Sequence, residues 1–149
     1  MLCNIIFVLA IAFVVIIALC SGRGTFKGGI SPFHTNIEAD TLSNDNYRKV
    51  IYTDKYQQVV LMSLNPGEDI PKEIHDGDQF FHIEAGDGYS IVGDNTQPIL
   101  LTDGSALVVP AGTPHYVKNN SPTKAFKLYS IYSPPQHKPS EINKRQPPD

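Results

Sequence analysis

The sequence has 149 residues, with 12 Lys and Arg against 15 Asp and Glu, and a formal net charge of -3 at pH 7. This length allows one domain with a sizeable hydrophobic core, and the weak negative charge excludes the basic surface that DNA or RNA binding requires. Cys3 and Cys20 are the two cysteines, and both lie in the apolar N-terminal segment. We therefore expect no nucleic-acid partner, and no disulfide or thiol chemistry in the folded domain.

The N-terminal segment is directed to a membrane. Residues 1–22 carry no charged side chain, and Ile5–Cys20 is an unbroken apolar run. A spanning helix needs about 20 apolar residues, whereas the apolar region of a cleavable signal has about 7 to 15. The absence of Lys or Arg at the start favours an uncleaved transmembrane anchor, although small residues near its end would suit cleavage and secretion. Arg23 and Lys27 follow, so the positive-inside rule predicts a single-pass protein with a cytosolic C-terminal domain.

After the anchor, residues 23–46 are rich in Gly, Ser, Thr and Asn, and predict a tether with an irregular lead-in. Residues 47–135 then show short β-prone runs between turn signals, without convincing helical periodicity. The predicted strands are Val50–Thr53, Gln57–Leu64, Gln79–Glu84, Tyr89–Val92, Ile99–Leu101, Ala106–Val109, His115–Lys118 and Ala125–Tyr132. This pattern predicts an all-β fold, an antiparallel barrel of the jelly-roll kind, preceded by one hydrophobic helix. Residues 136–149 form a charged, Pro-rich tail.

Two stretches, residues 66–86 and 104–119, resemble the first and second cupin motifs in spacing. The matching positions are Pro66, Gly67, Glu73, His75, Gln79 and Gly86 in the first, and Gly104, Pro110, Gly112, His115 and Asn119 in the second. The usual first motif has a histidine where this chain has Glu73 and a glutamate where it has Gln79. The resemblance implies a single cupin barrel, a double-stranded β-helix, with Glu73, His75, Gln79 and His115 as metal ligands.

Strand geometry agrees with this ligand set. Glu73 and His75 are two residues apart, so they face the same side of a strand, and Gln79 keeps that parity if the strand resumes after the intervening turn. Two imidazoles, one carboxylate and one amide oxygen suit Mn, Fe, Ni or Zn better than Ca or Mg. The alternative is a barrel without metal, whose histidines are satisfied by hydrogen bonds. His82 has the opposite parity, and we expect it and His34 at the surface.

The run from Asn44 to Pro135 resembles the small single-domain cupins often labelled mannose-6-phosphate isomerase-like. The resemblance includes VVLMSLNPGEDIPKEIHDGDQFFHIEAGDG and VVPAGTPHYVKN. In that group Glu-x-His and Asp-Gln-Phe-Phe replace the usual ligand pattern, which implies that Glu73 and Gln79 are native to the site. The label rests on fold kinship with a sugar isomerase and does not establish sugar isomerisation.

The charge of the predicted site bounds its chemistry. A divalent metal with one carboxylate ligand keeps a formal charge of about +1, which favours Lewis-acid chemistry on a small enolisable or anionic substrate. We expect an isomerase-like or dioxygenase-like reaction, with Glu73 as the general base. The cavity wall is expected to include Phe81, Ile83, Val108 and Val117, with Tyr129 or Tyr132 as hydroxyl donors, although each of these can equally be plain core.

A second class of function remains open from the sequence. In it the chain is a membrane-tethered barrel that binds a small ligand or a protein partner without catalysis, and the metal is structural or absent. An open coordination position would separate the two classes, because a catalytic site has one and a structural site is closed. We also expect a homodimer, formed through the edge strand Val50–Thr53 or through swapped terminal strands.

Overall fold

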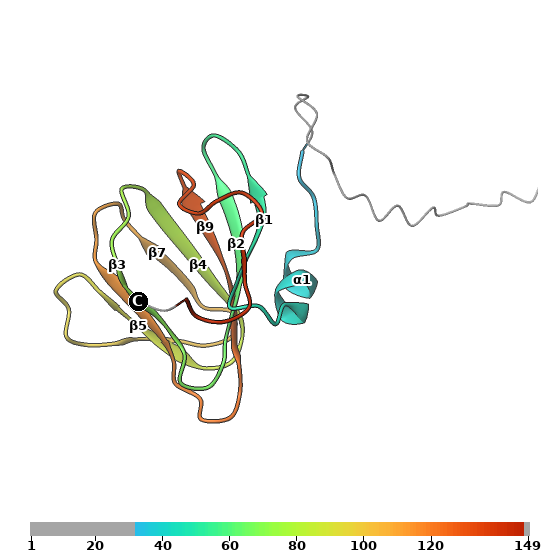
Figure 1. Cartoon of the computed structure of the whole chain (residues 1–149). Helices are drawn as coiled ribbons and strands as arrows, with labels where there is room; N and C mark the ends of the chain where they lie inside the picture. The colour runs from blue at the N-terminus through green and yellow to red at the C-terminus, as the bar shows by residue number, and fades with distance from the viewer. Residues whose placement is uncertain (1–31, 148–149) are drawn as a thin grey trace, which may run out of the picture. The chain divides into compact units, whose positions relative to one another are not determined.

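Ten strands form two antiparallel sheets around one hydrophobic core in the computed structural model, which describes residues 32–147 (Figure 1). The strands are β1 (Arg48–Thr53), β2 (Gln58–Leu64), β3 (Asp69–Glu73), β4 (Asp78–Ala85), β5 (Gly88–Val92), β6 (Ile99–Leu101), β7 (Ala106–Val109), β8 (His115–Asn119), β9 (Phe126–Ser133) and β10 (Ile142–Asn143). One sheet has the order β10-β1-β2-β9-β4-β7, and the other has the order β3-β8-β5-β6. All eight predicted strands are present, so the prediction of an antiparallel β fold is confirmed.

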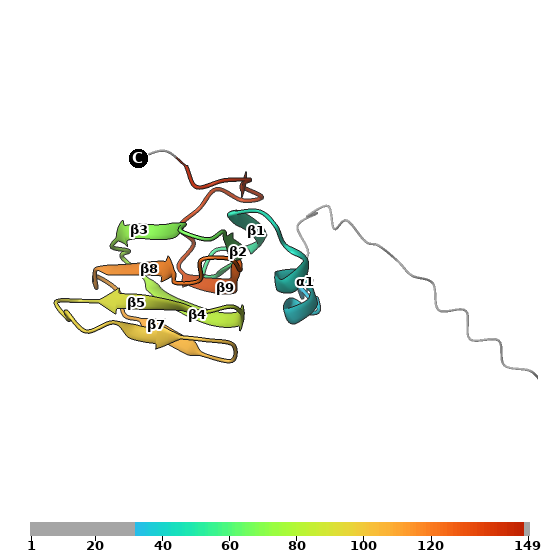
Figure 2. The same cartoon turned by 90° about the horizontal axis from the view of Figure 1, so that it is seen from below.

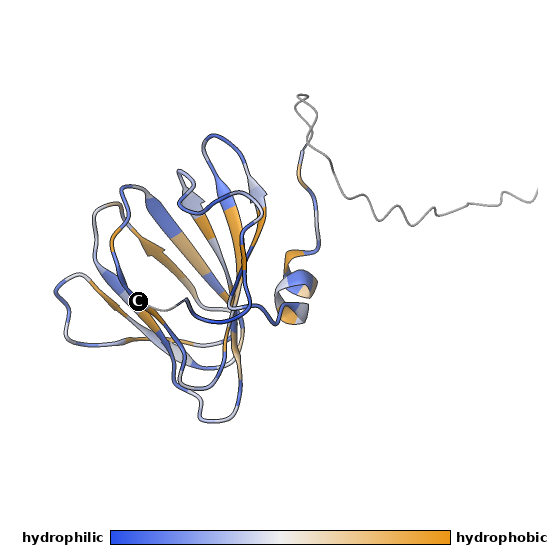
Figure 3. Ribbon diagram, in the orientation of Figure 1, coloured by the Kyte–Doolittle hydropathy of each residue, from blue (hydrophilic) through white to orange (hydrophobic). Residues whose placement is uncertain are grey.

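The core forms because inward-facing positions alternate with outward-facing positions along the strands. On β9, for example, Phe126, Leu128 and Tyr132 are each at most 1% exposed and belong to the core. Figure 3 shows hydrophobic segments in orange on the strands, with mostly hydrophilic colour in the connecting loops. Burial of apolar surface contributes about 25 cal/mol per Å², so this shared core holds the two sheets together.

The segment before the barrel contains a helix, α1 (Ile37–Ser43), that the sequence did not predict. The prediction of an irregular lead-in over residues 23–46 was therefore wrong for this stretch. Asn36 caps the helix, because its side chain accepts a hydrogen bond from a backbone N–H of the first turn at 3.1 Å. Lys127 of β9 donates to the carbonyl oxygen of Leu42 at 2.6 Å, and this bond holds α1 against the six-stranded sheet.

Strand β3 was missing from the predicted strands, although the ligand argument placed Glu73 and His75 on one strand. Glu73 is the last residue of β3, but the placement of His75 on a strand was wrong, because it lies in the connection to β4. Pro71 within β3 has no backbone N–H, and the pairing of β3 with β8 shifts register between Ile70 and Glu73. Three residue steps on β3 then correspond to two on β8, from Val117 to His115. This bulge lets both Ile70 and Glu73 face inward, which a regular strand would not allow.

The C-terminal tail connects the two sheets on the side where β1 and β3 lie (Figure 2). Its short strand β10 pairs with β1, with Asn143 opposite Arg48. Further along, Nε2 of Gln146 donates to Oδ1 of Asp69 on β3 at 3.0 Å. Residues 136–147 therefore form part of the folded barrel.

The tail also changes the expected sheet edge. The homodimer prediction used β1 as an exposed edge strand. However, β10 pairs with the first residues of β1, and the carbonyl oxygen of Glu141 accepts a hydrogen bond from the N–H of Val50 at 2.9 Å. The homodimer itself stays a prediction.

Within residues 32–147 there is no helix long and apolar enough to span a bilayer. The predicted anchor, residues 1–22, lies outside the described residues.

Candidate metal centre

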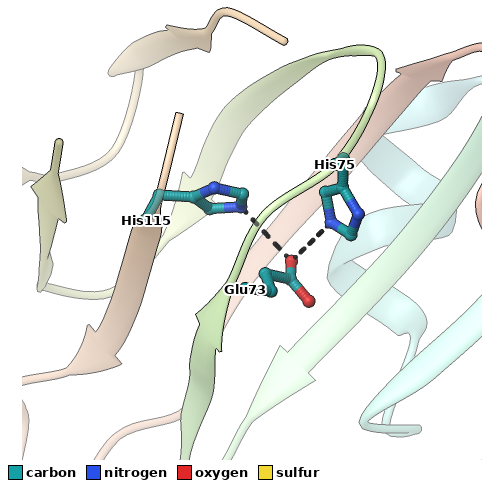
Figure 4. Close-up of side chains that lie close together, drawn as sticks. All are labelled: Glu73, His75 and His115. Carbon is teal, nitrogen blue, oxygen red and sulfur yellow. Dashed lines mark ion pairs between the residues drawn. The ribbon is translucent and has the colours of Figure 1, made fainter. Parts of the chain in front are cut away.

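Glu73, His75 and His115 form a compact cluster (Figure 4). Oε1 of Glu73 lies 3.0 Å from Nε2 of His75 and 3.3 Å from Nε2 of His115. One possible ligand atom from each residue lies within 4.8 Å of the others. Glu73 ends β3 and pairs directly with His115 at the start of β8, while His75 lies in the connection between β3 and β4. The strand register therefore brings together residues that are 42 positions apart in the chain.

Backbone contacts fix the two imidazoles. Gly112, in the turn between β7 and β8, has a φ of +74° that favours glycine, and its N–H donates to the carbonyl oxygen of His75 at 2.7 Å. Nδ1 of His115 lies 3.1 Å from the carbonyl oxygen of Thr113. Because a carbonyl oxygen only accepts, Nδ1 carries a proton, and Nε2, which faces Glu73, is the nitrogen that can bind a metal. Hydrogen bonds of this kind are typical of histidines that bind metals.

Gln79 reaches the interior from the other sheet. It lies on β4, opposite Tyr132 of β9, and is 1% exposed. Its Nε2 donates to Oγ of Ser130 at 3.1 Å, which leaves Oε1 as the free acceptor. The ring of Tyr132 lies 5.4 Å from the ring of His75, so this part of β4 and β9 is near the cluster. The role of Gln79 as a fourth ligand stays a prediction.

The unpaired atoms of these residues fit a metal ion. Each of the four has one buried atom without a hydrogen-bond partner among the described residues: Glu73 Oε1, His75 Nε2, Gln79 Oε1 and His115 Nε2. Glu73 touches both imidazoles, but the atoms are not aligned as hydrogen bonds. Metal bonds of about 2.1 Å place neighbouring ligand atoms about 3 Å apart, close to the separations of 3.0 and 3.3 Å observed here. The donor types suit Mn, Fe, Ni or Zn.

Electrostatics keeps Glu73 ionised. Burial would raise the pKa of this carboxyl, but its contacts with the imidazoles of His115 and His75 outweigh burial and lower the pKa to about 2. The anionic form binds metals, so the low pKa supports a role as ligand. A general base works best when its pKa is near the working pH, and the low pKa therefore favours the ligand role over the predicted base role.

Three of the four predicted wall residues lie in the interior, where they belong to the hydrophobic core. Phe81, Ile83 and Val117 are each 1% exposed and lie in the core, and the ring of Phe81 is 6.0 Å from that of His115. Val108 is 60% exposed, so its prediction as a wall residue was wrong. The reason is strand parity, because the neighbouring position 109 on β7 is the one that faces inward.

The two candidate tyrosines lie on opposite faces of β9. Tyr132 is buried inside and contacts His75. Tyr129 is wrong as an interior hydroxyl donor, because it stacks on His82 at 5.2 Å on the outer face. His82 is half-buried there and lies 3.4 Å from Glu84, and His34 is exposed. Neither histidine belongs to the cluster.

Sequence reasoning missed two polar residues that the fold brings to the interior, Arg48 and His137. Charges on Glu73 and Arg48 both affect the pKa of His137. A signal existed for Arg48, because it precedes the predicted strand at Val50 by two residues and so shares its inward face. His137 lies in a Pro-rich tail without periodicity, and no sequence pattern indicated it.

A hollow of about 340 Å³ borders His115 at the surface. It lies over β3, β5 and β8 and is lined by Lys72, Ile91, Gly93, Pro114 and Tyr116 besides the histidine. The hollow therefore lies on the outer side of this sheet, whereas the buried side chain of His115 faces the interior.

Comparison with known proteins identifies the family. The family model described as "Cupin domain" matches residues 60–132. The chain is 49% identical to protein L612 of Acanthamoeba polyphaga mimivirus over 114 residues, covering 75% of this chain and 71% of L612. The chain belongs to the cupin family. The matched region of this cupin contains all four predicted ligands.

Two further relatives support the same assignment. YrkC of Bacillus subtilis is 46% identical over 114 residues, which are 73% of this cupin and 61% of YrkC. The crystal structure of BH2720 from Bacillus halodurans aligns with a TM-score of 0.74 and 38% identity, covering 81% of this cupin and 95% of that chain. A cupin from Methanocaldococcus jannaschii with a double-stranded β-helix fold aligns with a TM-score of 0.56 and 16% identity, covering 62% of this cupin and 84% of that chain, so the two share this fold.

Proposed function

We propose that this cupin binds one divalent transition metal through Glu73, His75, Gln79 and His115, and is a metal-dependent enzyme acting on a small enolisable or anionic substrate. The observation that carries the proposal is the set of four buried, unpaired donor atoms, one from each of these residues, among the described residues. When bound, the metal would supply Lewis-acid chemistry by polarising a substrate oxygen.

The ligands have distinct roles in this proposal. Glu73 supplies the one negative charge, so a formal charge of about +1 remains to attract an anionic oxygen. His115 is held in one tautomer by the carbonyl oxygen of Thr113, and Gln79 is oriented by Ser130. Orientation before binding lowers the cost of assembling the site.

Isomerisation and oxygen-dependent cleavage of an enolisable substrate share a first step, the removal of a proton next to a carbonyl group. Glu73 is the carboxylate beside the site, but its pKa of about 2 makes it a weak acceptor for that proton, so we propose it as a metal ligand through one oxygen. Figure 4 shows that one of its carboxylate oxygens faces both imidazoles and that the other points away from them. The second oxygen is the one available to a substrate.

Elemental analysis of the purified full chain tests the metal site. We expect about one Mn, Fe, Ni or Zn per wild-type chain and loss of the metal in the His75→Ala/His115→Ala double variant. His82→Ala is the matched control, because this histidine lies on the outer face and should leave metal content unchanged. Wild-type protein that stays empty after incubation with each metal would refute the proposal and favour a binding barrel without metal.

Water relaxation separates an enzyme from a binding module. An open coordination position holds exchangeable water, whereas a closed structural site does not. We expect Mn²⁺ bound to the chain to enhance the relaxation of water protons, and a small chelating acid to reduce that enhancement. Absence of any enhancement at full Mn²⁺ occupancy would indicate a closed, structural metal.

We further propose that residues 1–22 tether the barrel to a membrane with the barrel on the cytosolic side. The apolar run and the two basic residues after it support this proposal. Fractionation of expressing cells tests it, with the full chain expected in the membrane pellet. Recovery of a shortened chain outside the cell would instead indicate a cleaved signal.

A further inference from the structure

Three polar residues that the proposed metal site does not use lie on the side of the barrel where the tail packs. They are Arg48 on β1, and His137 and Asn143 in the tail. Each has one buried atom without a hydrogen-bond partner in the described part of the chain: Nε of Arg48, Nε2 of His137 and Oδ1 of Asn143. Buried polar atoms are normally paired, so three unpaired atoms on adjoining segments leave hydrogen-bonding capacity for a polar ligand.

Arg48 is directed into the barrel. It shares the inward face of β1 with Val50, and its partner across the sheet, Met62, lies in the core. Its side chain is 12% exposed. Oε1 of Glu141 lies 3.7 Å from one terminal nitrogen, too far for a hydrogen bond, so this carboxylate orients the guanidinium without occupying its donors. A guanidinium has five N–H donors and matches an oxyanion in a two-pronged geometry.

His137 is held in place by its backbone. Gln58 is fully buried, and its Nε2 donates to the carbonyl oxygen of His137 at 2.8 Å while its Oε1 accepts from the N–H of the same residue at 2.9 Å. The imidazole packs edge-on against Tyr132 at 5.0 Å, and Tyr132 packs edge-on against His75 at 5.4 Å. A short series of ring contacts therefore leads from His137 to the metal ligands.

The charges of Arg48 and Glu73 both affect the pKa values of His137 and Tyr132. Burial and the positive charge of Arg48 lower the pKa of His137 to about 4, with smaller opposing effects from Glu141 and then Glu73. Burial raises the pKa of Tyr132, and both Glu73 and Arg48 also act on it. Arg48 therefore shares one interior with the cluster of Glu73, His75 and His115. His137 is neutral at pH 7 and can donate a hydrogen bond from Nε2.

We propose that Arg48, His137 and Asn143 bind the oxyanion of a substrate, a carboxylate or a phosphate, whose other end reaches the metal. This inference rests on the proposed function and narrows its substrate class to small acids that carry a metal-binding oxygen at the opposite end. Arg48 supplies the charge and His137 a neutral N–H, and the amide of Asn143 can turn its NH₂ toward the anion. Glu141 is the carboxylate that the anion must approach, and its charge is offset by Arg48.

Calorimetric titration of inorganic phosphate and of acetate into the full chain in detergent tests the site. We expect Arg48→Met to weaken phosphate binding about 10- to 100-fold and His137→Gln about 2- to 10-fold, as for charged and neutral hydrogen bonds. Lys49→Met is the matched control, because it removes a charge from the same strand, and its partner Leu61 is buried outside the core cluster, on the other face of the sheet. It should bind phosphate as the wild type does.

Measurements on metal-loaded and metal-free protein separate the two proposals. Metal binding should strengthen phosphate binding, because it offsets the charge of Glu73. A chain that takes up no metal yet binds phosphate through Arg48 would support the anion site and refute the metal function. Phosphate binding that is unchanged by Arg48→Met, or weakened instead by Lys72→Met in the hollow beside His115, would overturn the anion site.

Comparison of the two anions identifies the class of substrate. Tighter phosphate binding supports a phosphorylated substrate, tighter acetate binding supports a carboxylic acid, and binding of neither overturns the site. If Arg48→Met does not fold, Arg48→Lys keeps the charge but loses the planar fork, and should weaken binding about 3- to 10-fold. In wild-type protein, phosphate should shift the ring resonances of His137 in NMR spectra, and unshifted resonances at saturating phosphate would contradict the proposal.

Discussion

Glu73 and His115 are direct partners across β3 and β8, and Oε1 of Glu73 lies 3.3 Å from Nε2 of His115. The bulge after Ile70 makes this contact possible, because it turns the glutamate inward at the end of the strand. The carboxylate then carries the single negative charge of the predicted ligand set. Its removal should therefore affect metal binding more than any change on the outer face.

Glu73→Gln keeps the shape of the side chain and removes its charge. Loss of a residue that only hydrogen-bonds to a ligand lowers metal affinity about 10- to 100-fold. We expect a larger loss here, because Glu73 is itself a ligand in the proposed site. Competition with a chromophoric chelator for Zn²⁺ measures this affinity. Glu84→Gln is the control, because Glu84 pairs with His82 away from the cluster. Equal affinities for Glu73→Gln and wild type would contradict the ligand role.

Gln79→Glu tests the fourth ligand. If Gln79 binds the metal, a carboxylate at this position should raise metal affinity about 10-fold or more, since it adds a full charge to the donor set. Without metal, the same change places a second carboxylate near Glu73 and should lower the melting temperature. Thermal unfolding with and without Zn²⁺ measures both effects. A variant whose metal affinity equals that of wild type would show that Gln79 only supports the core.

The metal-free protein should lose stability in acid through His137. Its pKa is lowered from 6.5 to about 4 by burial and by Arg48, with opposing effects from Glu141 and Glu73 and a further lowering by His75. Between pH 6.5 and 4 the unfolded chain binds more protons, so acidification favours unfolding, and stability present above pH 6.5 is lost as the pH falls.

His137→Gln removes this titration. After a discount for the partly exposed ring, we expect wild type to lose about 2 kcal/mol more stability than the variant between pH 7 and 4. Urea unfolding in the presence of EDTA measures the difference. Parallel pH dependence in the two proteins would show that His137 titrates normally in the folded state.

Gln58→Leu should detach the tail from the barrel. The buried amide of Gln58 bonds both backbone polar groups of His137, and a leucine would leave them unpaired. We expect the free energy of unfolding to fall by about 2 to 3 kcal/mol. Gln57→Leu is the control. Gln57 is exposed, and its side chain makes no such contacts among the described residues. Similar urea midpoints for the two variants would contradict this role.

The sequence predicted the strands well where hydrophobic positions alternate regularly. It failed at β3, where Pro71 and the bulge break the alternation, although Glu73 was still found through motif spacing. It also failed at α1, whose seven residues are too few for a periodic signal, even though Asn36 is a suitable cap. In both cases the missing information was the tertiary pairing that stabilises a short or irregular segment.

The residues of the candidate site also differ in whether local sequence was sufficient to predict them. His75 and His115 meet because β3 and β8 pair, and motif spacing was sufficient to anticipate both. Val108 and Tyr129 were wrong because a shift of one position moves a side chain to the other face of a sheet. His137 could not be anticipated, because its position depends on the path of the tail and on a hydrogen bond to Gln58, 79 residues away.

The tail has a consequence for how function is transferred between relatives. The matched family region, residues 60–132, includes the four predicted metal ligands but ends before His137 and begins after Arg48. Two cupins can therefore share every residue of the metal centre and differ in the segments that would recognise the rest of a substrate. Similarity across the matched region covers only the predicted metal ligands, and comparison of the flanking segments is needed to predict which molecules a relative binds.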